Sequence, residues 1–215
     1  MELDPQRRGR ILEAAAKLIV ENGLQCSMSA IAQSAGVATG SVYNYFKSKD
    51  DLIRGVYRQL SETIGTLLIL PPSIELTAEE RIFRYIYDYI DFIWDDPNRA
   101  ILFEYLSNVP LITPQELAEI FDVVTRYSVS VMAAAREEGL LSDVPDSTLA
   151  GYIGGGIRNT LKWRRANSRP LSDKERQEIA LMSWNAIASA AAARDLTQIA
   201  SFGEHKDEVR LARNA

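Results

Sequence analysis

The chain has 215 residues, 47% of them hydrophobic and 25% charged, with a formal net charge of −5. This is an ordinary globular composition, and the length allows one large domain or a small module joined to a larger one. The chain has one cysteine and one histidine. A disulfide framework is therefore excluded, and neither a metal site nor a cofactor is expected. With no apolar run near the roughly 18 residues of a membrane span and no signal-peptide pattern, a cytoplasmic location without membrane contact is expected. We interpret Cys26 as a small buried side chain, with a redox switch as the alternative.

The charge is unevenly distributed along the chain. Residues 1–54 carry seven Lys or Arg and six Asp or Glu, which gives +1, whereas the remaining 17 basic and 23 acidic residues give −6. No acidic residue occurs from Asn22 through Lys49. Because a surface that binds a phosphate backbone must avoid uncompensated carboxylates, this stretch is a candidate for nucleic-acid binding.

Helical periodicity runs through the chain, without strand-like alternation or internal repeats, so an all-α fold of about nine helices is expected. The expected helices cover residues 6–21, two short segments between 27 and 46, then 48–70, 77–95, a short helix between 97 and 110, 113–139, 145–167 and 172–199. Thr77, Thr113 and Ser172 each precede a glutamate by three residues, which predicts capping boxes at three helix starts. The polar residues 203–215 are expected to form a disordered tail.

The segment from Ser27 to Phe46 fits a helix-turn-helix. Ala32 is small where two helices must cross closely, and Gly36 suits a left-handed turn that a Cβ would strain. Val42 is apolar where the second helix packs back on the first. Short hydroxyl side chains at the start of that second helix can reach base edges or phosphates.

The residues Ile31-Ala-Gln-Ser-Ala-Gly-Val, followed by Gly40-Ser-Val-Tyr-Asn-Tyr-Phe-Lys-Ser-Lys-Asp-Asp-Leu, resemble the DNA-binding domain of the TetR family of transcriptional repressors. The resemblance covers about residues 8–55, and the rest of the chain matches the family in length and helix count. It implies a three-helix DNA-binding domain at residues 1–47. It also implies a helical ligand-sensing and dimerisation domain at residues 48–202.

The resemblance implies a set of residues that contact operator DNA. These are Ser27, Thr39, Gly40, Ser41, Tyr43, Asn44, Tyr45 and Lys49. Ser27 would also cap the helix that it precedes. Tyr43 and Tyr45 have a second interpretation, as packing residues of the small domain, and Phe46 is expected to lie in the core.

The expected helix at 77–95 is apolar over most of its circumference, so it must be surrounded by other helices. This predicts a cavity for a small hydrophobic or aromatic inducer, with tyrosine hydroxyls as polar anchors. Its candidate lining comprises Phe83, Tyr87, Ile90, Phe103 and Glu104. Plain core packing is the alternative for the aromatic side chains. Glu104 could instead pair with an arginine or reach solvent.

Four glycines between residues 151 and 156 need a packing reason, because each interior glycine costs ~1 kcal/mol relative to alanine in a helix. Close approach of two helices in a homodimer is one reason, and room for a ligand is the other. The candidate dimer interface comprises Gly151, Gly154, Gly155, Ile187, Ala190 and Ala191.

The resemblance therefore implies a ligand-responsive repressor that binds a palindromic operator in double-stranded DNA as a homodimer and is released by an inducer. An all-α enzyme is a rival interpretation, but the sequence offers no nucleophile with a histidine partner, no metal cluster and no paired carboxylates on an apolar face. A helical adaptor that binds protein is another rival, and the acid-free stretch from Asn22 to Lys49 argues against it.

Overall fold

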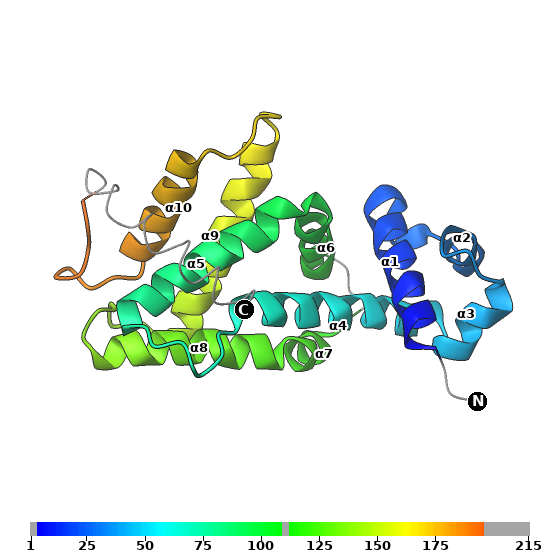
Figure 1. The fold of residues 1–215 in the computed structure, drawn as a ribbon, viewed down its shortest axis with the longest axis horizontal. Helices are drawn as coiled ribbons and strands as arrows, with labels where there is room; N and C mark the ends of the chain where they lie inside the picture. Colours follow the sequence, from blue (N-terminus) through cyan, green and yellow to red (C-terminus); the bar gives the residue numbers. More distant parts are fainter. Residues whose placement is uncertain (1–3, 109–111, 196–215) are drawn as a thin grey trace. The chain divides into compact units, whose positions relative to one another are not determined.

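The computed structural model describes residues 4–108 and 112–195, and apart from one isolated β-bridge between Leu141 and Ala188 its regular structure there is helical (Figure 1). The elements are α1 (Pro5–Asn22), the 3₁₀ helix η1 (Gly23–Gln25), α2 (Met28–Ser34), α3 (Thr39–Tyr45), α4 (Lys49–Leu68), α5 (Ala78–Asp95), α6 (Pro97–Asn108), α7 (Pro114–Ile120), α8 (Asp122–Glu137), α9 (Asp146–Arg165) and α10 (Asp173–Asn185). The predicted all-α fold is confirmed, with ten α-helices in the described ranges where about nine were expected. The predicted tail at 203–215 lies outside the described residues. No described helix has the length and apolar character needed to cross a membrane.

Polar side chains fix the start of several helices, and the three predicted capping boxes are present. At α7 the Thr113 hydroxyl accepts from the Glu116 N–H at 3.2 Å, and the Glu116 carboxylate accepts from the Thr113 N–H at 2.9 Å. The boxes at residues 77–80 and 172–175 have the same reciprocal arrangement. Each box satisfies backbone N–H groups that have no partner within their helix.

The helix predicted at 113–139 is two helices, because the chain turns at Phe121 between α7 and α8. The hydroxyl of Ser61 on α4 donates to the Ile120 carbonyl at 2.7 Å, an acceptor that an uninterrupted helix would offer to the N–H of residue 124. The Phe121 ring packs on Phe103, with ring centroids 5.8 Å apart. Both contacts are long-range, so the local sequence pattern does not reveal the break.

The periodicity predicted that the last helix continues to about residue 199, but α10 ends at Asn185. Residues 196–199 lie outside the described ranges. The Asn185 side chain donates to the Arg194 carbonyl at 2.8 Å and accepts from the Arg194 N–H at 2.9 Å. The Trp184 indole donates to the Ala192 carbonyl, and the Arg194 guanidinium binds Glu79 at the start of α5. These contacts hold residues 186–195 in turns where the alanine-rich sequence favours a helix.

The chain forms two compact units, which we describe separately. The first comprises Met1–Ile69 and Asp95–Thr125, and the second comprises Leu70–Trp94 and Arg126–Ala215. The functional boundary that the sequence places between residues 47 and 48 stays a prediction.

In the first unit, α1, α2 and α3 gather at one end of α4 (Figure 1). The side of α1 that faces inward is almost completely buried, with Ile11, Leu12, Ala15 and Ile19 at most 1% exposed. Helix α4 approaches α1 very closely at Gly55, where a Cβ would lie 2.9 Å from the Leu12 side chain and 2.9 Å from the Phe46 ring. The packing at this point therefore requires glycine.

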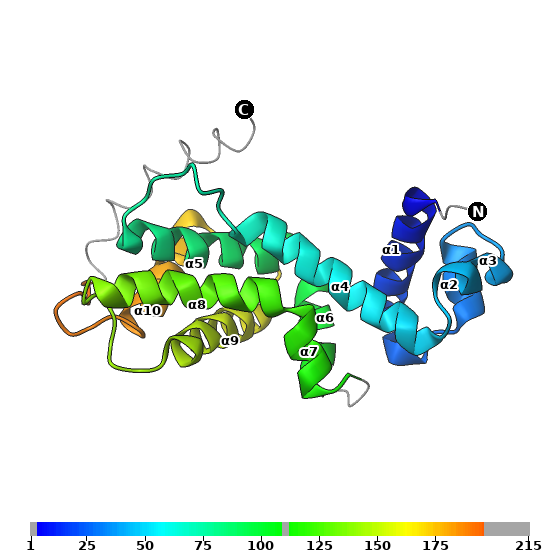
Figure 2. The ribbon, with the colours of Figure 1, turned by 90° about the horizontal axis from the view of Figure 1, so that it is seen from below.

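In the second unit, α5 lies beside α8 and α9 (Figure 2). The Tyr85 hydroxyl shares a hydrogen bond of 3.1 Å with Ser128 on α8, and Arg158 on α9 donates to the Tyr89 hydroxyl. Burial raises the pKa of Tyr85 to about 12, so this hydroxyl stays protonated and can act as a donor. The buried interior of this unit thus contains neutral tyrosine hydroxyls that are satisfied by neighbouring helices.

We expect Gly55→Ala to lower the free energy of unfolding by about 1–2 kcal/mol, because overpacking of Leu12 and Phe46 exceeds the gain in helix propensity. Gly9→Ala on α1 is the matched control, because a Cβ there meets nothing within 4 Å, and it should raise stability by up to about 1 kcal/mol. Urea unfolding followed by circular dichroism measures both. Equal stability of the two variants would contradict the close approach at Gly55.

Candidate nucleic-acid interface

Helices α2 and α3 are joined by a tight turn that sets their crossing. Gly36 has a φ of +67°, in the left-handed region, and the Val37 N–H donates to the Ala32 carbonyl at 3.0 Å. Helices α2 and α3 pack on each other, and Ala32, 1% exposed, and Val42, fully buried, both lie in the core of this motif. This is the geometry that the sequence predicted for a helix-turn-helix.

The outer side of α3 carries the exposed residues of the motif. Thr39, Gly40 and Asn44 are exposed, and the Tyr43 side chain is exposed although it is large and aromatic, with 51% of its surface accessible. Ser41 and Tyr45 are half-buried, and Phe46 is in the core, as expected. A short helix with an exposed polar and aromatic face, backed by a small core, has the form of a helix that enters the major groove of DNA.

Two further predicted contacts lie at helix starts that flank α3. Ser27 is the N-cap of α2, where its hydroxyl accepts from the Ala30 N–H at 3.1 Å. Lys49 is the first residue of α4 and is half-buried, next to the exposed N-cap Ser48. Ser27 therefore has a structural role that is independent of any contact with DNA.

The neighbourhood of Lys49 includes the cysteine. Cys26 is 7% exposed, and burial raises the pKa of its thiol, while the nearby Lys49 ammonium acts in the opposite direction. A raised pKa keeps the thiol protonated and unreactive at neutral pH. Cys26 thus behaves as the small buried side chain that the sequence suggested.

The surface from α2 to the start of α4 carries no carboxylate between Asn22 and Lys49. The first carboxylates after the acid-free stretch are those of Asp50 and Asp51 at the start of α4. Asp51 is used within the chain, because it accepts from the Lys47 N–H at 3.0 Å. The surface from α2 to the start of α4 therefore combines hydroxyls, amides and lysines, a combination that can bind phosphates and base edges.

Residues 11–56 match the family model described as bacterial regulatory proteins, tetR family. The chain is 27% identical over 143 residues to the fatty acid metabolism regulator protein of Bacillus subtilis, covering 66% of this chain and 74% of that protein. Its fold is similar to the crystal structure of a TetR family transcription regulator from Marinobacter aquaeolei, with a TM-score of 0.76, 19% identity and coverage of 85% and 96%. It is also similar to the transcriptional regulator FadR from Bacillus subtilis in complex with stearoyl-CoA, with a TM-score of 0.63, 25% identity and coverage of 80% and 97%.

The N-terminal segment of the chain thus matches the TetR family, and the chain as a whole is similar to regulators of that family. The matched segment runs from α1 through the helix-turn-helix to the start of α4, close to the residues 8–55 on which the sequence resemblance rests. Regulators of this family bind DNA through the N-terminal helices and carry a helical C-terminal domain. The roles of individual residues in this chain stay predictions.

The predicted ligand-pocket residues lie in both units of the chain. Phe83, Tyr87 and Ile90 are on α5 in the second unit, whereas Phe103 and Glu104 are on α6 in the first. Phe83 is 6% exposed and its ring stacks on Trp184 with centroids 5.1 Å apart; Ile90 is fully buried. Glu104 is exposed. The contacts of Phe83 are those of a packed core residue, and they leave the predicted cavity untested.

The predicted dimer residues also divide into two groups. Gly154 and Ile187 are buried within the chain, and a Cβ on Gly154 would lie 3.2 Å from Arg158 and 3.6 Å from the Tyr89 hydroxyl. Gly151, Ala190 and Ala191 are exposed, and Gly155 is half-buried with nothing within 4 Å of an added Cβ.

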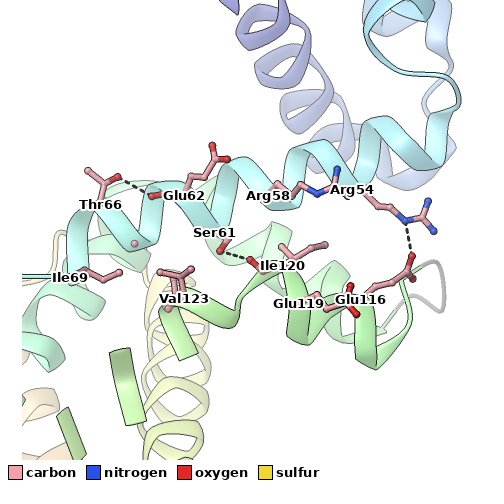
Figure 3. A pocket seen from close by; sticks show the side chains of 12 residues that line it. Arg54, Arg58, Ser61, Glu62, Thr66, Ile69, Glu116, Glu119, Ile120 and Val123 are labelled. Atoms are coloured by element: carbon pink, nitrogen blue, oxygen red, sulfur yellow. Dashed lines mark hydrogen bonds and ion pairs between the residues drawn. The ribbon is translucent and has the colours of Figure 1, made fainter. Parts of the chain in front are cut away.

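The structure adds two features that the sequence analysis missed. Tyr152 and Trp163 on α9 are large aromatic side chains that are 63% and 66% exposed, and their spacing of 11 residues, about three helical turns, could have indicated a shared helix face. The second feature is a groove of about 620 Å³ along α4, crossed by an ion pair between Arg54 and Glu116 (Figure 3). No sequence signal indicates this pair, because its members are 62 positions apart.

Replacement of Ser27 separates capping from DNA binding. We expect Ser27→Asp to keep the stability of the protein within about 0.5 kcal/mol, because aspartate is an equally good N-cap and suits the positive end of a helix. The same change should weaken DNA binding about tenfold, because it places a carboxylate against the phosphate backbone. Ser27→Ala should instead cost about 1 kcal/mol of stability. Urea unfolding and DNA titration measure the two effects, and wild-type affinity in Ser27→Asp would remove Ser27 from the interface.

Proposed function

We propose that this protein is a ligand-responsive transcriptional repressor, without enzymatic activity, that acts on operator DNA in the cytoplasm. The observation that carries the proposal is the exposed face of α3 in a segment that matches the TetR DNA-binding domain and lacks carboxylates from Asn22 to Lys49. Thr39, Tyr43 and Asn44 approach the bases or phosphates of the major groove, and Lys49 binds a phosphate.

We propose a homodimer that places two α3 helices in successive major grooves of a palindromic site, ~34 Å apart. The proposal is supported by the outer face of α9, where Tyr152 and Trp163 flank Gly155 with their side chains largely exposed. Glycine between two aromatic side chains lets a facing helix approach closely, and aromatic side chains are enriched in interface cores. Regulators of this family generally act as dimers.

We propose that a small hydrophobic or aromatic molecule releases the operator. Two similar proteins support a ligand with apolar character: the Bacillus subtilis fatty acid metabolism regulator and the FadR structure with stearoyl-CoA. In this chain α5 contributes the buried apolar side chains of Ile82, Ile86 and Ile90, which suit a ligand that makes few hydrogen bonds. A ligand shifts the equilibrium between two states only by its difference in affinity for them.

DNA binding is tested by the salt dependence of affinity for the DNA upstream of the protein's own gene. Lys49→Ala should reduce the slope of log K against log salt concentration by about 1 per subunit, because one phosphate contact is lost. Lys17→Ala is the matched control, since Lys17 is an exposed lysine of α1 outside the candidate interface and should leave the slope unchanged. Tyr43→Ala should weaken binding without unfolding. An unchanged slope in a folded Lys49→Ala protein would contradict the predicted phosphate contact.

The dimer is tested at Gly155. A leucine there meets open space in the single chain, so Gly155→Leu should fold normally while it holds the facing helices apart. Sedimentation at micromolar concentration should therefore show a monomer with wild-type helicity. Ser130→Leu, an exposed position on α8, is the control and should remain dimeric. A Gly155→Leu variant that is still a dimer would move the interface away from α9.

A further inference from the structure

Two polar contacts fasten α7 to α4 within the first unit. The Arg54 guanidinium donates from Nε to Oε1 of Glu116 at 3.0 Å, and the Ser61 hydroxyl donates to the Ile120 carbonyl at 2.7 Å (Figure 3). Arg54 and Ser61 are seven residues apart on α4, about two helical turns, so they lie on one face of that helix. Glu116 and Ile120 are one turn apart on α7. We call these two contacts the α4–α7 clasp.

Glu116 is held in place for its part in the clasp. Its second carboxylate oxygen, Oε2, accepts from the Thr113 N–H at 2.9 Å and from the Thr113 hydroxyl at 3.1 Å. The Thr113 backbone N–H lowers the pKa of Glu116 most, followed by the Thr113 hydroxyl and by Arg54, so the carboxylate is ionised at neutral pH. One carboxylate therefore caps α7 and binds α4 at the same time.

The Ser61 contact marks the end of α7. Ser61 is 7% exposed, so its hydroxyl must be paired within the protein, and it takes the carbonyl at the point where the helix breaks before α8. The clasp thus fixes both ends of α7: Arg54 holds its first turn, and Ser61 holds its last residue.

Helix α4 transmits the position of the clasp to the DNA-binding helices. Gly55, the neighbour of Arg54, lies at the close contact with Leu12 of α1 and Phe46 after α3. Because this contact is closely packed, α4 cannot shift without also moving α1 and α3. The groove of about 620 Å³ along α4 includes the clasp residues together with Gly65 and Val123. This open space allows α7 to move relative to α4 when the clasp is broken.

We infer that Arg54, Ser61 and Glu116 are positioning residues that set the orientation of α4 and, through it, the placement of the helix-turn-helix on DNA. The inference rests on the proposed function. The intact clasp stabilises the orientation in which both modules of the dimer fit a full operator. Loss of the clasp lets α4 occupy other orientations, which reduces simultaneous engagement of two half-sites while the contacts of each module are unchanged.

The test compares binding to a full palindromic operator with binding to DNA that carries one half-site. Glu116→Gln removes the ion pair but keeps the cap, because glutamine also serves at this position of a capping box. Glu116→Gln, Arg54→Gln and Ser61→Ala should each weaken full-operator binding about fivefold and change half-site binding less than twofold. The double variant of Arg54 and Glu116 should be no weaker than either single variant, because the two side chains act as one pair.

Arg58→Gln is the matched control. Arg58 lies one turn from Arg54 on the same groove, is exposed and makes no ion pair in the described part of the chain, so its loss changes charge equally without breaking the clasp. Urea unfolding confirms that each variant is folded.

The positioning role would be overturned if the clasp variants lost equal affinity for the full operator and for the half-site, or if they bound the full operator more tightly. It would also be overturned if Arg58→Gln lost as much affinity as Arg54→Gln. Additive losses in the double variant would do the same. A wild-type protein that binds neither DNA would overturn the proposed function itself. Binding by the wild type without any change in the variants would overturn only the role of the clasp.

Discussion

The close packing of α4 against α1 at Gly55 is the contact on which the architecture of the first unit depends. A missing Cβ lets the helix axes approach until Leu12 and Phe46 touch the α4 backbone. The same contact buries the apolar side of α1 and supports the end of α3, because Phe46 follows that helix directly. The candidate DNA-contact residues lie on the seven-residue helix α3, which depends on this support for its placement.

Two carboxylates of this unit, those of Glu116 and Asp51, form hydrogen bonds within the chain. Glu116 offers one oxygen to the start of its own helix and the other to a helix 62 positions earlier, and Asp51 caps the turn before α4 through the Lys47 N–H. The negative charge of Glu116 is balanced by the Arg54 guanidinium in this ion pair. The acidic net charge of the chain is therefore compatible with binding DNA, since its location and partners matter more than its sum.

The parts of the fold that depend on neighbours in sequence could be predicted, and those that depend on distant partners could not. The helix-turn-helix was predictable, because Ala32, Gly36 and Val42 act within a single short motif. The capping boxes were predictable for the same reason, since each spans four residues. The break at Phe121 depends on Ser61, and the end of α10 depends on Arg194 and its partner Glu79, so helical periodicity alone extended both helices too far. The candidate interface could thus be proposed from residues 27–49 alone. The pairing of Arg54 with Glu116 could not, because it depends on the packing of α4 against α7.

The ion pair of Arg194 with Glu79 has a consequence for the order of synthesis. The two residues are separated by 115 positions, and the ring that covers Phe83 belongs to Trp184, so α5 emerges from the ribosome long before its partners exist. At roughly 5–20 residues per second the wait lasts on the order of 10 s. During that interval the apolar side of α5 lacks the partners that cover it in the folded protein, while the segments α1 to α4 are already available to pack. The packing of the second unit is therefore completed only when its C-terminal residues have been synthesised.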